Sequence, residues 1–133
     1  MSNIKVVNPR GLVQPTGYNH GASVPLDGQL LFISGQIGWN PDGKLVSGCV
    51  GQFGQALSNL LSVVAEAGGG SESVAKLTIF VTDQAEYTKA RKEIGEAYRR
   101  CMGHHYPAMS LVEVKGLLES GARVEIEGVA LIP

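Results

Sequence analysis

The sequence predicts one α+β domain over residues 1–133, because of its length, its hydrophobic periodicity and its glycine-rich turns. A chain of this length has the usual size of a single domain and buries roughly two-thirds of its unfolded surface. Apolar residues recur every three or four positions in two stretches, which indicates helices. In other stretches they alternate or run together, which indicates strands. We therefore expect a mixed sheet with two helices packed on one face.

The first third of the chain is expected to form strands and turns. A short strand over 4–7 precedes a loop over 8–21 that is rich in proline, glycine and asparagine. Such an ordered loop is a candidate for lining a site. Next, Ala22–Pro25 and the apolar run Leu30–Ile33 flank an Asp27-Gly28 turn, which is the pattern of a β-hairpin. The chain is thus predicted to begin as an antiparallel meander.

Two amphipathic helices are expected in the remainder of the chain. Residues 51–67 carry large apolar side chains at helical spacing and lead into three successive glycines, which stop a helix. The second helix starts at Asp83, which has capping-box spacing with Glu86, and its apolar stripe runs to Cys101. Strands are expected over 74–82, 107–114 and 123–132. Helices on one face leave the other face of the sheet to be covered by further subunits.

Charge and cysteine content argue against several classes of function. Lys and Arg number 11 against 12 for Asp and Glu, so no excess positive charge is available to bind nucleic-acid phosphates. The two cysteines have no metal-binding spacing and follow no signal peptide, so we expect free thiols in a cytoplasmic protein. No apolar stretch reaches the roughly 18 to 20 residues of a membrane span. The histidines form no zinc-type pair, and His104-His105 are expected to cap the second helix. We therefore expect no metal, cofactor, membrane segment or nucleic-acid partner.

Two acidic residues alternate with apolar ones in the last expected strand. Glu125 and Glu127 follow Val124 and Ile126, so both carboxylates lie on one sheet face. Such a pair either faces solvent or lines a polar cleft, and solvent is the more frequent outcome. Ser34 before a glycine is more simply a strand end than a nucleophile, because no base is identifiable. The residue pattern alone leaves both questions open.

Short motifs in order along nearly the full chain carry a family resemblance. They are Gly17–Gly21, Phe32–Ile37, the helix over 52–68, Tyr106–Ala108, Val112–Val114 and Val124–Glu127. Together they resemble the RidA/YjgF family of reactive-intermediate deaminases, whose older label is translation-inhibitor endoribonuclease. The resemblance implies a chorismate-mutase-like fold, a homotrimer and a small-molecule cleft at each subunit interface.

The resemblance also implies a reaction and a set of site residues. In deaminating members an enamine tautomerises to an imine, water attacks the C=N carbon, and ammonia leaves without a metal or organic cofactor. By this resemblance Glu125 would be the catalytic residue that positions or deprotonates the water. The substrate would lie against Tyr18, Ser34, Gly35 and Gln36.

The chain departs from the family pattern at the expected cleft. Deaminating members carry Arg directly after Pro-Ala, and its planar fork binds the substrate carboxylate. This chain has Met109 there, and Leu111 stands where many members have cysteine. Both side chains are expected to line the cleft and make it more apolar. Lys92 occupies a position where the second helix commonly has asparagine.

Other residues are candidates to supply what Met109 does not. Arg91, Lys92 and Arg99 lie on the second helix, and one of them is a possible replacement cation. Trp39 and Tyr98 are candidates for aromatic walls around a larger or less charged substrate, although core packing is the commoner role of each.

The sequence thus favours hydrolysis of an enamine or imine in an inter-subunit cleft. A non-catalytic ligand-binding or regulatory module of the same fold is the alternative, and Met109 supports it. An endoribonuclease is disfavoured by the balanced charge and by the lack of an aromatic and basic patch.

Overall fold

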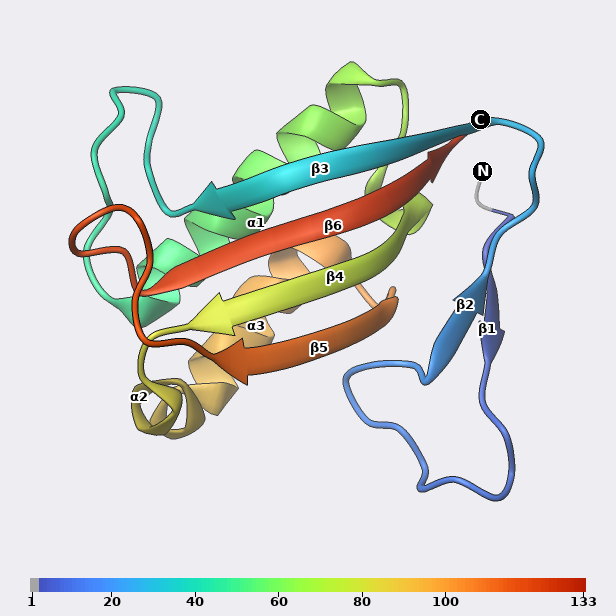
Figure 1. Cartoon of the computed structure of the whole chain (residues 1–133), viewed down its shortest axis with the longest axis horizontal. Helices are drawn as coiled ribbons and strands as arrows, with labels where there is room; N and C mark the ends of the chain where they lie inside the picture. Colours follow the sequence, from blue (N-terminus) through green and yellow to red (C-terminus); the bar gives the residue numbers. More distant parts are fainter. Residues whose placement is uncertain (1–2) are drawn as a thin grey trace.

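A computed structural model describes residues 3–133 as a four-stranded sheet backed by helices, with a separate two-stranded hairpin near the N-terminus (Figure 1). In chain order the elements are β1 (Lys5–Val7), β2 (Gly21–Ser23), β3 (Gln29–Ile37), α1 (Cys49–Glu66), the 3-10 turn η1 (Ser71–Ser73), β4 (Val74–Val81), α2 (Gln84–Lys89), α3 (Arg91–Met102), β5 (Ala108–Glu113) and β6 (Val124–Ile132). No helix within this range is long and apolar enough to cross a membrane.

The large sheet is mixed, and its strand order is β3-β6-β4-β5. β6 pairs antiparallel with both β3 and β4, whereas β4 and β5 run parallel. Along β6, Val124 and Ile126 are fully buried, and Glu125 and Glu127 between them are not. This alternation shows that one face of the sheet packs against the core and the other does not.

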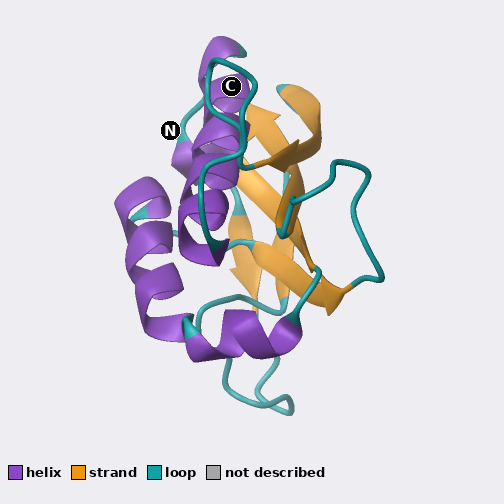
Figure 2. Cartoon of the chain, turned by 90° about the vertical axis from the view of Figure 1, so that its left-hand side faces the viewer, coloured by secondary structure: helices purple, strands orange, loops and turns teal. Residues whose placement is uncertain are grey.

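Helices α1 and α3 cover the same face of the sheet (Figure 2). The stripe of α1 that meets the sheet is formed by Phe53, Leu57, Leu60 and Val64, all of them inaccessible to solvent. Each such side chain stabilises the fold by about 1.5–3 kcal/mol relative to an exposed one. The α+β architecture with helices on one face is therefore confirmed.

The expected hairpin between Ala22–Pro25 and Leu30–Ile33 is wrong. β2 pairs instead with β1, and β3 pairs with β6 at the far end of the chain. Pairing with β6 brings Ile33 into the core, opposite Gly128. The Asp27-Gly28 turn only redirects the chain, so the opening segments form no meander.

The second expected helix is divided in two, so residues 3–133 form three α-helices where two were predicted. Asp83 does cap α2, because its carboxylate accepts a hydrogen bond of 3.0 Å from the backbone N–H of Glu86. The helical path breaks at Ala90 before α3 begins. The break lets Tyr87 on α2 and Ile94 on α3 both pack against the core.

The histidines after α3 do not cap it as expected. Gly103 ends the helix, and its N–H donates to the carbonyl oxygen of Arg99. A ring nitrogen of His105 instead lies 2.7 Å from the carbonyl oxygen of Val74, at the start of β4. His105 thus anchors the connection to β5, and His104 is exposed.

Gln52 joins α1 to two loops through its buried side-chain amide. It donates to the carbonyl oxygens of Val46 and Gly121, at 3.2 and 3.1 Å, and accepts from the N–H of Arg123 at 2.8 Å. Its side chain is almost completely buried. The buried amide therefore ties the segment that leads into β6 to α1.

Gln52→Met should destabilise the protein, because the hydrogen-bonding partners of the amide lose their bonds. We expect a loss of about 2 kcal/mol in the free energy of unfolding, measured by urea denaturation. Gln55→Met is the matched control on the same helix, because Gln55 bonds only the side chain of Asn59. A loss for Gln52→Met no larger than for the control would contradict this role.

Candidate functional site

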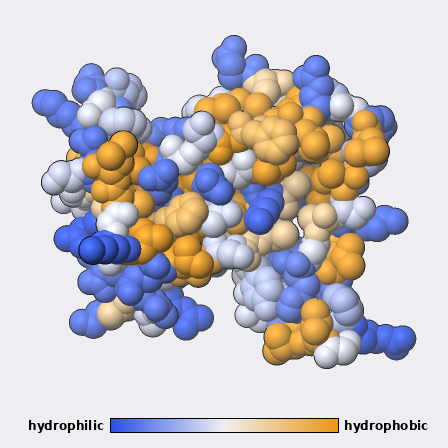
Figure 3. Space-filling view, in the orientation of Figure 1, coloured by the Kyte–Doolittle hydropathy of each residue, from blue (hydrophilic) through white to orange (hydrophobic). Residues whose placement is uncertain are grey.

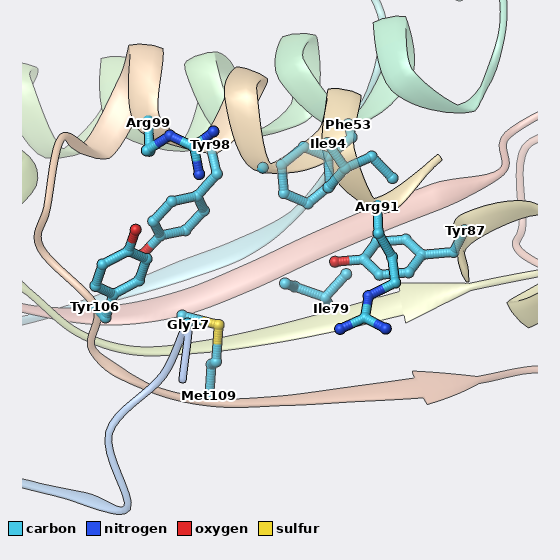
Figure 4. Close-up of a pocket in the computed structure, with 11 residues that line it drawn as sticks. Gly17, Phe53, Ile79, Tyr87, Arg91, Ile94, Tyr98, Arg99, Tyr106 and Met109 are labelled. Carbon is cyan, nitrogen blue, oxygen red and sulfur yellow. The ribbon is translucent and has the colours of Figure 1, made fainter. Parts of the chain in front are cut away.

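A small cavity lies between α3 and the edge of the sheet formed by β4 and β5 (Figure 4). Its volume is about 190 Å³, the volume of roughly six water molecules in the liquid, so it suits a small metabolite better than a drug-sized ligand. The lining residues are Gly17, Phe53, Ile79, Tyr87, Arg91, Ile94, Gly95, Tyr98, Arg99, Tyr106 and Met109.

Strands β4 and β5 supply the apolar side of the cavity. Met109 pairs with the fully buried Leu77 in the parallel register, so its side chain points toward the helices. The thioether lies opposite α3 in Figure 4. Leu111 lies on the same side but packs against the core, outside the lining. Of the two residues expected to make the cleft apolar, only Met109 reaches the cavity.

The loop over 8–20 closes one end of the cavity. The amide of Asn19 donates to the carbonyl oxygen of Tyr106, and its oxygen accepts from the amide of Asn8 at 2.8 Å. This docking places Gly17 at the cavity with a φ of 75°, a conformation that glycine adopts without strain. The loop, which was expected to line a site, thus reaches the cavity through Gly17. Tyr18 itself packs edge-on against His20, 5.3 Å between ring centroids, and is not among the lining residues.

Stacked tyrosines form an aromatic wall. The rings of Tyr98 and Tyr106 are nearly parallel, with centroids 5.2 Å apart, and the Tyr98 hydroxyl donates to the carbonyl oxygen of His105 at 2.7 Å. Burial, with a smaller contribution from Tyr106, raises the pKa of Tyr98. Burial also raises the pKa of Tyr87. Both phenols therefore stay protonated at neutral pH and do not act as bases.

Two of the three candidate replacement cations reach the cavity. All three side chains are exposed, but only Arg91 and Arg99 are lining residues, and Lys92 lies outside the cavity. No carboxylate is among the lining residues. Within residues 3–133, no group of three His, Cys, Asp or Glu side chains has a geometry that could hold a metal ion. The cavity is therefore positively charged and lacks an obvious acid or base.

The expected catalytic carboxylate lies elsewhere, on the face of the sheet without helices. Glu125 is half-buried and crosses Gly35, where a Cβ atom would come within 1.9 Å of the carboxylate oxygen Oε2. The β3–β6 register shifts between Ile33 and Gln36, so Ser34 and Gly35 form a bulge at this point. Gln36 folds back on that bulge, and its amide donates to the carbonyl oxygen of Ser34 at 3.1 Å. No hydrogen bond to the Glu125 carboxylate forms within the described range 3–133.

The expected site residues thus fall into two groups on opposite faces of the sheet. Met109 faces the helices at β5, whereas Glu125 faces away from them on β6, and β4 separates the two strands. Trp39 belongs to neither group, because it is 41% exposed in the loop after β3 and outside the cavity. A single chain does not bring the proposed substrate pocket and the proposed base together.

Apolar side chains are exposed on the face that carries Glu125. Phe32 is 75% exposed and Leu30 is 48% exposed on β3, and Val112 is 42% exposed on β5. Hydrophobic side chains gather over β3 and β6 in the space-filling view (Figure 3). Exposed apolar patches of this kind are typical of surfaces that contact another molecule.

Several lining residues were missed in the sequence. The sequence pattern predicts core positions for Tyr87 and Ile79, and Tyr106 was noted only as part of the motif Tyr106–Ala108. The one usable signal was the position of Gly17 within a loop already singled out for its composition. The rest depends on how α3 docks on the sheet.

Fold and cavity define an α+β domain with a small cavity beside the edge strand β5 of a mixed sheet. Residues 12–132 match the family model described as Endoribonuclease L-PSP. The chain belongs to this family, the RidA/YjgF family.

Relatives and solved structures agree with this assignment. A RutC family protein of Aquifex aeolicus is 44% identical over 102 residues, 76% of this chain and 79% of the relative. The human 2-iminobutanoate/2-iminopropanoate deaminase is 35% identical over 103 residues, 76% of this chain and 72% of the enzyme. The structure of the Rid-family protein YyfB from Yersinia pestis superposes with a TM-score of 0.86 at 30% identity, covering 98% of this chain and 99% of that one. RidA from Psychrobacter gives a TM-score of 0.69 at 28% identity, covering 90% and 92%.

The contact between Gly35 and Glu125 predicts a specific coupling. Gly35→Ala should destabilise the protein by about 1–3 kcal/mol, because the added methyl group forces the carboxylate out of its position. In a Glu125→Ala background the same change should cost much less, since the conflicting atoms are gone. Thermal unfolding of the four proteins of this double-mutant cycle measures the coupling. Additive effects would show that Glu125 does not lie across Gly35.

Proposed function

We propose that this protein hydrolyses a small enamine or imine, with release of ammonia, in a cleft between the subunits of a homotrimer. The observation that carries the proposal is the half-buried carboxylate of Glu125, which lies across Gly35 and has no hydrogen-bonding partner among residues 3–133. A carboxylate in that state is free to bind a water molecule. Human and bovine relatives named 2-iminobutanoate/2-iminopropanoate deaminase support the choice of reaction.

The need for several subunits follows from the separation of the two groups of residues. The cavity beside Met109 opens at the β5 edge, whereas Glu125 lies on the uncovered face of the same sheet. If the edge of one subunit packs on the face of the next, unlike surfaces meet, and such contacts form a closed ring where the rotation between subunits closes. Three copies are what the family resemblance implies. The exposed Phe32 and Leu30 would then be covered.

The proposed reaction needs one group that moves protons and no cofactor. An enamine first becomes an imine when a proton adds to its β-carbon and the nitrogen loses one. Glu125 takes a proton from water as the oxygen forms a bond to the C=N carbon. That proton passes to nitrogen and gives a carbinolamine. The hydroxyl proton of the carbinolamine then also moves to nitrogen, the C–N bond breaks, and ammonia leaves as the carbonyl forms. The sum is enamine plus water giving ketone plus ammonia, and Glu125 ends unchanged.

Met109 favours a second candidate, a non-catalytic ligand-binding module of the same fold. A thioether offers dispersion contacts but no hydrogen-bond donor, so it cannot hold a carboxylate as an arginine fork would. The family description also names an endoribonuclease. That activity is disfavoured by the formal net charge of −1 and by a cavity of about 190 Å³.

Glu125→Gln should abolish turnover and leave ligand binding almost unchanged, because only proton transfer is removed. We expect kcat to fall by about 100-fold or more, with ligand affinity changed only a few fold. The assay generates a panel of enamines in situ, 2-aminoacrylate among them. It follows decay and ammonia release for the enamine that the unmodified protein hydrolyses fastest.

Glu127→Gln is the matched control, because Glu127 lies on the same strand and the same face but is exposed. Equal loss in both variants would refute the assigned role of Glu125. Ligand binding without turnover in the unmodified protein, across a panel of enamines, would establish the binding module instead.

A further inference from the structure

Two guanidinium groups share the cavity at Met109, and neither is neutralised. Arg91 and Arg99 both line it, and no acidic side chain does. Within residues 3–133 the ion pair that forms joins Arg123 to Glu86. In the same range, neither cavity arginine has a carboxylate partner or a hydrogen-bond acceptor. A small pocket with two unpaired cations is selective for anions.

The two charges face the cavity from different levels of α3. Arg91 and Arg99 are eight residues apart, a spacing that belongs to one helix face and corresponds to about 12 Å along the axis. The Arg99 side chain folds back toward the start of the helix and lies over Gly95. A Cβ atom added at Gly95 would be only 3.2 Å from Nη1 of Arg99. The glycine leaves room for the guanidinium against the helix. Figure 4 shows the Arg99 group beside Tyr98 and the Arg91 group toward Ile79 and Tyr87.

Apolar and aromatic groups fill the space between the two cations. Ile79, Ile94 and Met109 lie in the middle of the cavity, and the stacked pair Tyr98 and Tyr106 forms one side. None of these side chains provides a cation. A matching ligand therefore has an apolar middle and an anionic group at each end.

We propose that this cavity binds a dicarboxylate, with one carboxylate on Arg91 and the other on Arg99. The inference rests on the proposed function, since it names the substrate class of the same cleft: an imino acid that carries a second acid group. The two helix arginines would replace the missing fork at position 109 and select against substrates with a single carboxylate. Each guanidinium forms charge-assisted hydrogen bonds with a carboxylate, and their planar geometry favours a paired contact.

Dicarboxylate binding to this cavity can be tested by titration calorimetry. The whole protein is titrated with straight-chain dicarboxylates from malonate to suberate. One chain length should bind about tenfold or more tightly than the monocarboxylate of the same length, because the second ion contact is lost in the latter. Arg91→Gln and Arg99→Gln should each reduce the dicarboxylate affinity to the level of the monocarboxylate. Equal affinity for the two ligand series, or no binding of any dicarboxylate at millimolar concentration, would overturn the proposal.

Arg100→Gln is the matched control on the same helix. Arg100 is exposed and lines a different groove, formed with Val50 and Gly54 of α1, so its loss should leave the affinity unchanged. An equal effect of all three substitutions would show that only general charge matters. Arg91→Lys and Arg99→Lys keep the charge but lose the fork, and they should retain intermediate affinity. Thermal unfolding confirms that each variant is folded.

The dicarboxylates used contain no C=N bond, so binding is read independently of turnover. Selective dicarboxylate binding without ammonia release from any imine would support this inference and refute the deaminase. Ammonia release from imines with one carboxylate, without any preference for dicarboxylates, would support the deaminase and refute this inference.

Discussion

Helices α1 and α3 pack on the same face of the four-stranded sheet, and this one-sided packing is the constraint on which the rest of the structure depends. It fixes the alternation along β6, where Val124 and Ile126 are buried beneath the helices and Glu125 points to the uncovered face. A shift of one residue would turn Glu125 into the core and both apolar side chains out of it. The position of Glu125 is therefore determined by burial in the core, not by its immediate neighbours.

The same constraint divides the candidate site. On the helix-covered side, α3 and the edge strand β5 leave the cavity beside Met109, with two arginines on its rim. On the uncovered side, the bulge at Gly35 leaves room for the carboxylate of Glu125. Neither half contains both a substrate pocket and a base. Contact between copies of the chain would join the halves and would also remove the exposed Phe32 from water.

Local patterns in the sequence predicted most elements but not all of their partners. The helix expected over 51–67 is α1, and the strands expected over 74–82 and 123–132 are β4 and β6, within two residues at each end. The spacing of apolar residues within each segment indicates which of its faces is buried, and this spacing is a local property of the sequence. The pairing of β3 with β6 is not local, because it joins segments at opposite ends of the chain. A turn signal beside β3 therefore predicted the wrong neighbour.

For the site as well, the sequence identified candidate residues but not how they are arranged in space. The alternation along the last strand placed Glu125 on one face but could not decide between solvent and a cleft. The sequence does not show which of Arg91, Lys92 and Arg99 faces the cleft. The packing of α3 on the sheet places Arg91 and Arg99 at the cavity and leaves Lys92 outside it. Met109 and Glu125 belong to one proposed cleft, yet they lie on opposite faces of the sheet. Only the three-dimensional arrangement reveals this separation, and the proposed cleft requires a second chain for that reason.

Mixing of two inactive variants tests this central claim most directly. Glu125→Gln removes the proposed base, and Met109→Trp fills the cavity of about 190 Å³. If each cleft takes its cavity from one subunit and its carboxylate from the next, random trimers of the two variants contain about one intact cleft in four. Co-refolded mixtures should then recover about a quarter of the unmodified hydrolytic activity. Activity no higher than that of the separate variants would show that the cavity and Glu125 do not work across a subunit interface.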